Sequence, residues 1–264
     1  MSIIGSTLIK HNIYYKNQVV KTDNDWDRSF PLDSPRLQEL RWWYTNLQAW
    51  NSRSLLPNTP SQTIFVDASN TGWGYNRKGQ RAHGYWTSEE AAQSINWREL
   101  KAAHLALKTF RIPNNTTVLI RTDNTTSLSY INKQGGIRSL PLLELATKVW
   151  NWCLQRSIMI QAQHISGIYN NIADLESRRT FFKNQWQIKP EIFQQINQLW
   201  GPHQVDLFAD RTTRLLLKYV SWLPDPDAIH TDAFTLPWKH WTLPFANPPW
   251  NLISRVLQKI VVEQ

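Results

Sequence analysis

The hydrophobic positions of residues 61–182 follow first the period of strands and then that of helices. Runs rich in β-branched and aromatic residues predict strands at 63–67, about 72–76, about 82–86, 116–122 and 158–164. Apolar residues at helical spacing predict helices at about 97–110, 125–133, 139–156 and 171–182. Three strands in succession favour an antiparallel meander, and the later strand–helix alternation favours parallel crossovers. We therefore predict an α/β fold with a mixed five-stranded sheet and helices on both of its faces.

The segments on either side of this region have different patterns. Ser34 as N-cap, with a proline next to it, predicts a helix whose apolar stripe is Leu37, Leu40, Tyr44, Leu47 and Trp50. Residues 51–62 are rich in Pro, Ser and Asn and are typical of a linker. The composition shifts again after about residue 183. We expect a helical segment at 1–60, the α/β domain at 61–182, and a small, incomplete α/β segment at 183–264.

Charge adds a candidate partner to this picture. The chain carries a formal charge of +9, and residues 61–182 hold 14 basic against 8 acidic residues, so six of the nine excess charges lie in the α/β domain. Basic residues interleaved with Trp and Tyr favour a polyanionic partner, most often nucleic acid. The alternative is a solvated basic surface with no partner.

Other features restrict the class of protein. The one cysteine, Cys153, excludes an internal disulfide framework, and its place in a helical pattern predicts a core residue. The N-terminus lacks the pattern of a signal peptide, and no apolar run approaches the roughly 18 residues of a membrane span. We expect an intracellular protein, cytoplasmic or nuclear, with no membrane partner.

Four acidic residues stand in unexpected places. Asp67 and Asp123 each end an apolar strand, Glu99 lies in line with the apolar face of its helix, and Asp174 falls in the first turn of a helix. Each position has a structural explanation. Asp67 suits a turn, Glu99 forms a capping box with Asn96, Asp123 is an N-cap, and Asp174 interacts favourably with the helix dipole.

Taken together, the four acids favour a metal site. The carboxyl ends of parallel strands lie at one edge of a sheet, where sites form in α/β proteins. Converging carboxylates repel one another unless a cation compensates them, and carboxylate oxygens suit Mg²⁺ or Mn²⁺. Two such ions about 3.5–4 Å apart activate water and stabilise the leaving oxygen of a phosphodiester. Zinc is not expected, because Cys and His residues lack ligand spacing.

The four motifs around these acids resemble the ribonuclease H (RNase H) family in its retroelement form. The motifs are "FVDASNTGWG", "NWRELKAAHLAL", "IRTDNTTSLSYI" and "HISGIYNNIADLESR". The resemblance implies an RNase H-like fold and an endonuclease that cleaves the RNA strand of RNA–DNA hybrids. It also implies that two Mg²⁺ ions are held by the four acids, Asp67 bridging both, and that His164 assists proton transfer and product release. By the same resemblance, contacts to the hybrid come from Ser69, Asn70 and Asn124.

The flanking segments resemble other parts of a retroelement polyprotein. "VDLFAD" and "FANPPW" resemble the adenine-N6 DNA methyltransferase-like module of DIRS-type retrotransposons. The resemblance implies a base-binding loop of Asn247, Pro248, Pro249 and Trp250, with Asp206 and Asp210 on the S-adenosylmethionine side. No Gly-rich cofactor loop is present, which counts against methyl transfer. Residues 34–56 resemble the segment that joins reverse transcriptase to RNase H, so a reverse transcriptase domain is an expected partner. The alternative is an inactive nucleic-acid-binding remnant.

Overall fold

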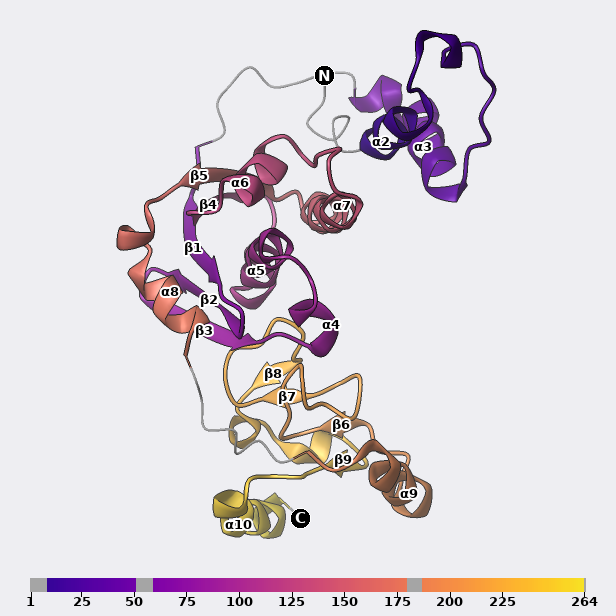
Figure 1. Cartoon of the computed structure of the whole chain (residues 1–264). Coiled ribbons are helices and arrows are strands. Elements are labelled where there is room, and N and C mark those ends of the chain that lie inside the picture. The colour runs from indigo at the N-terminus through magenta and orange to yellow at the C-terminus, as the bar shows by residue number, and fades with distance from the viewer. Residues whose placement is uncertain (1–8, 51–58, 180–186, 264) are drawn as a thin grey trace.

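A five-stranded mixed sheet forms the centre of the computed structural model, which describes residues 9–50, 59–179 and 187–263 (Figure 1). Its strand order is β3-β2-β1-β4-β5. The strands are Gln62–Ala68 (β1), Gly72–Arg77 (β2), Gln80–Tyr85 (β3), Thr117–Thr122 (β4) and Met159–His164 (β5). The first three pair antiparallel, whereas β4 is parallel to β1 and β5 is parallel to β4. This is the sheet of the RNase H-like fold, and it confirms the predicted α/β class.

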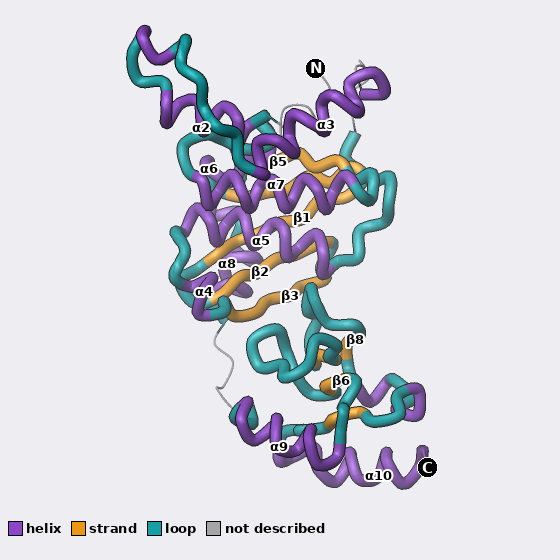
Figure 2. The backbone as a smooth tube through the Cα atoms, turned by 90° about the vertical axis from the view of Figure 1, so that its right-hand side faces the viewer, coloured by secondary structure: helices purple, strands orange, loops and turns teal. Residues whose placement is uncertain are grey.

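Helices cover both faces of this sheet. On one face α5 (Ile95–Thr109) packs on β1 and against α7 (Leu140–Leu154), with α6 (Thr125–Asn132) beside them (Figures 1 and 2). On the other face α8 (Asn171–Ser177) packs on β1 and β2. A short helix, α4 (Ser88–Ala91), follows β3. The predicted helix at 171–182 therefore ends at Ser177, and its residues beyond 179 lie outside the described ranges.

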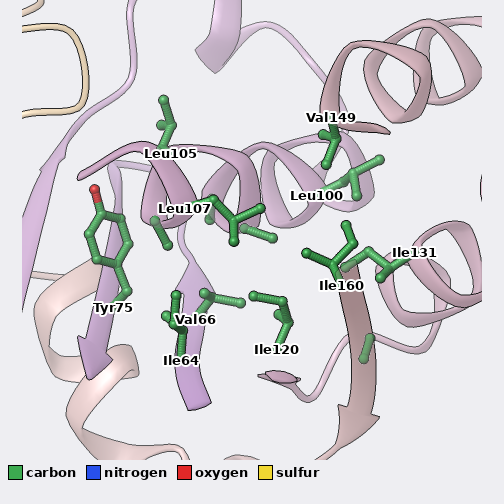
Figure 3. Packing of buried hydrophobic residues seen from close by; sticks show 14 of the residues in the cluster. Ile64, Val66, Tyr75, Leu100, Leu105, Leu107, Ile120, Ile131, Val149 and Ile160 are labelled. Atoms are coloured by element: carbon green, nitrogen blue, oxygen red, sulfur yellow. The ribbon is translucent and has the colours of Figure 1, made fainter. Parts of the chain in front are cut away.

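The core lies between the sheet and α5. Ile64 and Val66 alternate with more exposed residues along β1, and Figure 3 shows them beside Leu107 of α5. Leu100 lies near Ile160 in the same view. Alanines at 102, 103 and 106 are buried on α5, so the helix approaches the strands closely. Cys153 is fully buried, which confirms its prediction as a core residue.

The described N-terminal residues form two helices, α2 (Lys10–Val19) and α3 (Ser34–Trp50). They are joined through the buried carboxylate of Glu39, which accepts hydrogen bonds from His11 and Asn12 of α2. The predicted N-cap Ser34 is wrong by one residue, because Asp33 Oδ1 accepts the bond from the Arg36 amide. The predicted apolar stripe exists but is exposed to solvent at Leu37, Leu40, Tyr44 and Leu47.

The C-terminal part has a small core of its own. Its helices are α9 (Pro190–Trp200) and α10 (Ile253–Glu263), and its two-residue strands are Val205–Asp206 (β6), Val220–Ser221 (β7), His230–Thr231 (β8) and Pro244–Phe245 (β9). β6 pairs with β9 and β7 with β8, both parallel. The buried apolar residues of this part form a cluster separate from the core of the large sheet.

An ionic contact joins this part to the RNase H-like domain. Arg211 donates to both oxygens of Glu90, at 2.7 and 2.8 Å, and both side chains are about nine-tenths buried. Lys101 of α5 also lies 3.3 Å from Glu90. Lys108 of α5 pairs with Asp227 nearby. The C-terminal part therefore packs at the β3 edge and α4, as Figure 1 shows. No helix in the described residues has the length and apolar character to cross a membrane.

Candidate metal centre

Three of the four predicted acids meet at the edge of the sheet. Asp67 lies next to the end of β1, and Asp123 is the first residue after β4, its parallel neighbour. Glu99 comes from the second turn of α5. One carboxylate oxygen from each of these residues lies within 4.8 Å of the other two. The parallel pairing of β1 and β4 and the packing of α5 on β1 bring the three carboxylates together.

The protein environment disfavours negative charge at this cluster. Burial, together with the charges of Asp67 and Asp123, raises the pKa of Glu99 to about 9. Burial also raises the pKa of Asp67 to about 6, although a hydrogen bond from Ser177 opposes the rise. Within the described ranges, none of the three carboxylates forms an ion pair with Lys, Arg or His. The cluster therefore holds more acid than the surrounding charges compensate.

These properties fit a divalent cation. Glu99 Oε2 is buried and has no hydrogen-bond partner among the described residues, a state that is costly for a polar atom. A cation bound by Asp67, Glu99 and Asp123 would provide that partner and neutralise the repulsion. Three carboxylates with no sulfur or imidazole ligand match the preference of Mg²⁺ or Mn²⁺.

The fourth acid lies beside the cluster rather than in it. Asp174 is half exposed in the first turn of α8, and its Oδ1 accepts a 2.6 Å hydrogen bond from Arg178. Its charge contributes to the raised pKa of Asp67, so the two carboxylates are electrostatic neighbours. His164, the last residue of β5, is exposed and pairs in register with Thr122, the residue before Asp123. His164 thus lies at the same edge of the sheet.

Two of the structural explanations for the acids are wrong, because neutral residues cap the helices. Ser94 is the N-cap of α5, and its Oγ accepts a hydrogen bond from the Trp97 amide. Asn124 is the N-cap of α6, and its Oδ1 accepts from the Ser127 amide at 2.8 Å. The carboxylates of Glu99 and Asp123 are therefore not used as helix caps.

The residues predicted to contact nucleic acid have partners within the protein. The Asn124 amide nitrogen donates to Asn96 Oδ1 at 2.9 Å. Asn70 is exposed, and its side-chain and backbone oxygens accept from Arg98. Ser69 is buried, and its hydroxyl donates to the Ser177 carbonyl at 2.7 Å. Only Asn70 among the three presents an exposed side chain.

The prediction omitted two residues that touch the site. Ser177 Oγ donates to Asp67 Oδ2 at 2.5 Å. The side-chain amide of Asn170 donates to the Val66 carbonyl at 2.9 Å, in the residue before Asp67. Both residues fall in the fourth quoted motif, so the sequence analysis had singled out the segment that contains them. Nothing in the motif indicated that these two side chains contact a strand about 100 positions earlier.

The predicted C-terminal loop lines a separate pocket. Asn247, Pro249 and Trp250 border a cavity of about 860 Å³, which Asp210 also lines. Trp73 and residues 83–85 of the large sheet line it as well. Pro248 does not line it.

The two predicted cofactor acids of this part are used by the fold. Asp210 Oδ1 accepts hydrogen bonds from Thr212 and Thr213. Asp206 is buried, and its oxygens accept from the amides of Phe208 and Leu215.

A scan against models of protein families finds no match for this sequence, and a search of curated proteins finds none either. Similar solved structures include the foamy viral protease–reverse transcriptase dRH in complex with double-stranded DNA, which is 16% identical with a TM-score of 0.28 over 61% of this chain and 28% of that one. The foamy viral protease–reverse transcriptase in complex with double-stranded DNA is 13% identical, with a TM-score of 0.28 over 61% and 38% of the two chains. The native prototype foamy virus protease–reverse transcriptase is 14% identical, with a TM-score of 0.28 over 60% and 21%. This chain spans well under half of each neighbour. The fold assignment rests on strand order and connections, not on this likeness.

Proposed function

We propose that residues 61–182 form a metal-dependent RNase H-type endonuclease that hydrolyses the RNA strand of RNA–DNA hybrids. The observation that carries this proposal is the convergence within 4.8 Å of the carboxylates of Asp67, Glu99 and Asp123, the first two of them buried, with no ion pair among the described residues. The basic excess of the same residues supports a nucleic-acid substrate. The RNase H-like strand order supports the reaction class by analogy of fold.

The proposed roles of the residues follow from their places. Asp67, Glu99 and Asp123 would hold Mg²⁺ or Mn²⁺. Asp174 would become the fourth carboxylate ligand on breaking its hydrogen bond with Arg178 and binding a metal ion instead. A bound pair of ions supplies an activated water and a stabilised leaving oxygen, so that the products are a 3′-hydroxyl and a 5′-phosphate. The exposed imidazole of His164 would transfer protons to or from solvent at the edge of the site.

The substrate would lie across the edge of the sheet that carries these residues. Asn70 and Asn124 are the proposed contacts to the backbone and 2′-hydroxyl groups of the hybrid, which distinguish RNA from DNA. Ser69 would act through the turn that its hydroxyl holds. Arg178 and Arg179 are more than half exposed at the end of α8 and would contact phosphates.

We further propose that the chain is part of a retroelement reverse-transcription polyprotein, most like the DIRS type. The four motifs support this origin. Residues 1–60 would join the nuclease to a reverse transcriptase domain, and residues 183–264 would be a separate C-terminal unit. The separate apolar cluster of the C-terminal part supports the second division.

The decisive experiment is cleavage of a labelled RNA–DNA hybrid by the full chain with Mg²⁺. We expect cutting of the RNA strand that is lost in Asp67→Asn and after EDTA treatment, and retained in Asp23→Asn, an exposed acid far along the chain from the cluster. Single-stranded RNA and duplex DNA are the substrate controls. Hybrid binding without cutting would refute the nuclease and favour the inactive binding remnant.

The pocket of about 860 Å³ favours a second candidate function, the binding of an adenine base. Asn247 and Trp250 line it together with Trp73 and Tyr85, and aromatic rings are the groups on which bases stack. Methyl transfer to adenine N6 is the activity that the loop sequence would imply. Equilibrium dialysis with labelled S-adenosylmethionine, beside Trp250→Ala, tests it, and absence of binding would leave the nuclease as the one function.

A further inference from the structure

The last residue of α8 places a hydroxyl against the carboxylate cluster. Ser177 Oγ lies 2.5 Å from Asp67 Oδ2 and 2.9 Å from the Asp174 carbonyl oxygen. Ser177 is 2% exposed and Asp67 is 5% exposed, so water does not compete for this contact. A serine hydroxyl has one proton to donate, and a carboxylate is a stronger acceptor than a carbonyl. The hydroxyl therefore donates to Asp67 whenever that carboxylate is ionised.

Two contacts fix the position of this hydroxyl. α8 lies directly on β2 at Gly74, where a Cβ atom would come within 2.2 Å of the Ser177 nitrogen and 2.5 Å of the Ala173 oxygen. From the other side, Ser69 Oγ donates to the Ser177 carbonyl at 2.7 Å. Gly74 also pairs in register with Asp67. The backbone of Ser177 is thus held against the strand pair that carries Asp67.

A hydrogen bond to one oxygen restrains the orientation of an aspartate. The terminal torsion of Asp is broad and roughly two-fold, so packing alone defines the carboxylate plane poorly. A metal site needs its ligands within about 0.5 Å and 10–20° of the productive geometry. Hydrogen-bond partners of ligating carboxylates supply this restraint in metal sites.

We propose that Ser177 is a positioning residue for the metal centre, which orients the Asp67 carboxylate through this hydrogen bond. The inference rests on the proposed function, because it requires that Asp67 bind a divalent cation. It also gives Ser69 a role: Ser69 holds the carbonyl of Ser177, and through it the hydroxyl that restrains Asp67.

The test measures metal binding rather than turnover. The dissociation constant of Mn²⁺ is determined by electron paramagnetic resonance on the full chain, with Ser177→Ala, Ser177→Cys and Thr147→Ala beside it. Thr147→Ala is the matched control, because the hydroxyl of Thr147 has, among the described residues, a single hydrogen-bond partner, the Leu143 carbonyl on α7. We expect Kd to rise about 10–100-fold in Ser177→Ala. The near-isosteric thiol of Ser177→Cys is a weak donor, so its Kd should lie between those of Ser177→Ala and the unsubstituted chain.

The outcomes separate the inference from the function on which it rests. If the unsubstituted chain binds no Mn²⁺, the metal centre itself is refuted, and the role of Ser177 with it. If the unsubstituted chain and both Ser177 variants bind with one Kd, only the positioning role is refuted. Circular dichroism checks that each variant is folded. If Ser177→Ala does not fold, a folded Ser177→Cys with unchanged Kd is the refuting result.

Discussion

Replacing Glu99 with glutamine should stabilise the metal-free protein, and the gain should grow with pH. The pKa of Glu99 is raised from 4.5 to about 9, so the folded chain keeps a proton here that the unfolded chain releases above about pH 4.5. Between these two values the stability of the folded state falls as pH rises, because the unfolded state binds fewer protons. Glutamine is neutral throughout and removes this loss.

The size of the expected stability gain follows from the difference between the working pH and the pKa of Glu99 in the unfolded chain. At pH 7.5 the solution is about three units above the unfolded pKa, and each unit corresponds to about 1.4 kcal/mol. The expected gain is at most about 4 kcal/mol at pH 7.5 and close to zero at pH 4.5. For a chain of this size, about 2–4 kcal/mol corresponds to a rise in Tm of roughly 5–15 °C.

Urea denaturation in EDTA, followed by tryptophan fluorescence at pH 5 and pH 8, measures this gain. Glu144→Gln is the control, because Glu144 is exposed on α7 and should change stability little at either pH. Added Mg²⁺ should reverse the order at pH 8, since the metal stabilises the ionised glutamate and glutamine binds it poorly. A metal-free Glu99→Gln that is no more stable than the unsubstituted chain at pH 8, or a gain independent of pH, would show that the burial argument is wrong.

Three further predictions concern a buried histidine, the close contact of α8 with β2, and a buried ion pair. Burial and the charges of three lysines lower the pKa of His104 to about 3, so the folded state loses stability as pH falls below 6.5. His104→Leu removes this loss and should raise stability by about 2 kcal/mol more at pH 5 than at pH 8, which urea denaturation at both pH values checks. Gly74→Ala should destabilise the fold by about 1–3 kcal/mol or more and weaken Mn²⁺ binding, since the added Cβ would displace α8 at Ser177. Arg211→Met should lower stability by about 3–5 kcal/mol, because the buried Glu90 carboxylate loses both of its hydrogen bonds from Arg211. In a double-mutant cycle, adding Glu90→Gln should recover part of this loss. Losses that simply add would contradict a direct interaction between the two side chains.

Most elements of the RNase H-like domain could be predicted from apolar residues at strand or helix spacing, but α4 was missed, because its four residues are too few to show a period. β5 buries Ile160 and Ala162 at alternate positions, with Gln161 and Gln163 between them as the less buried residues, and this alternation is present in the sequence. The C-terminal strands could not be predicted, because two residues are too few to show a period. The sequence also could not predict that the apolar stripe of α3 is exposed to solvent. The spacing of apolar residues identifies an apolar face of a helix, but it does not show whether another element covers that face.

The sequence predicted the acidic residues of the site, but it did not predict the residues that hydrogen-bond to them and hold them in place. Parallel neighbours bring Asp67 and Asp123 to one edge, so their meeting follows from topology. The bonds that hold them depend on contacts across the chain. Ser69 was expected to face nucleic acid, and its hydroxyl instead reaches Ser177, 108 positions later. Turn composition alone does not indicate such a partner.

The residues that cap α5 and α6 help to explain why Glu99 and Asp123 occupy their positions. At α5 and α6 the N-caps are the neutral side chains of Ser94 and Asn124, so neither helix depends on Glu99 or Asp123 for its start. Burial raises the pKa of Glu99 to about 9, which means that this carboxylate lowers the stability of the metal-free protein near neutral pH. A group that caps nothing and destabilises the fold is accounted for by a ligand that binds it. Measuring the stability of Glu99→Gln with and without Mg²⁺ therefore tests both arguments in one experiment. The Glu99 carboxylate must destabilise the metal-free folded state, and it must also bind the metal ion that the proposed function requires.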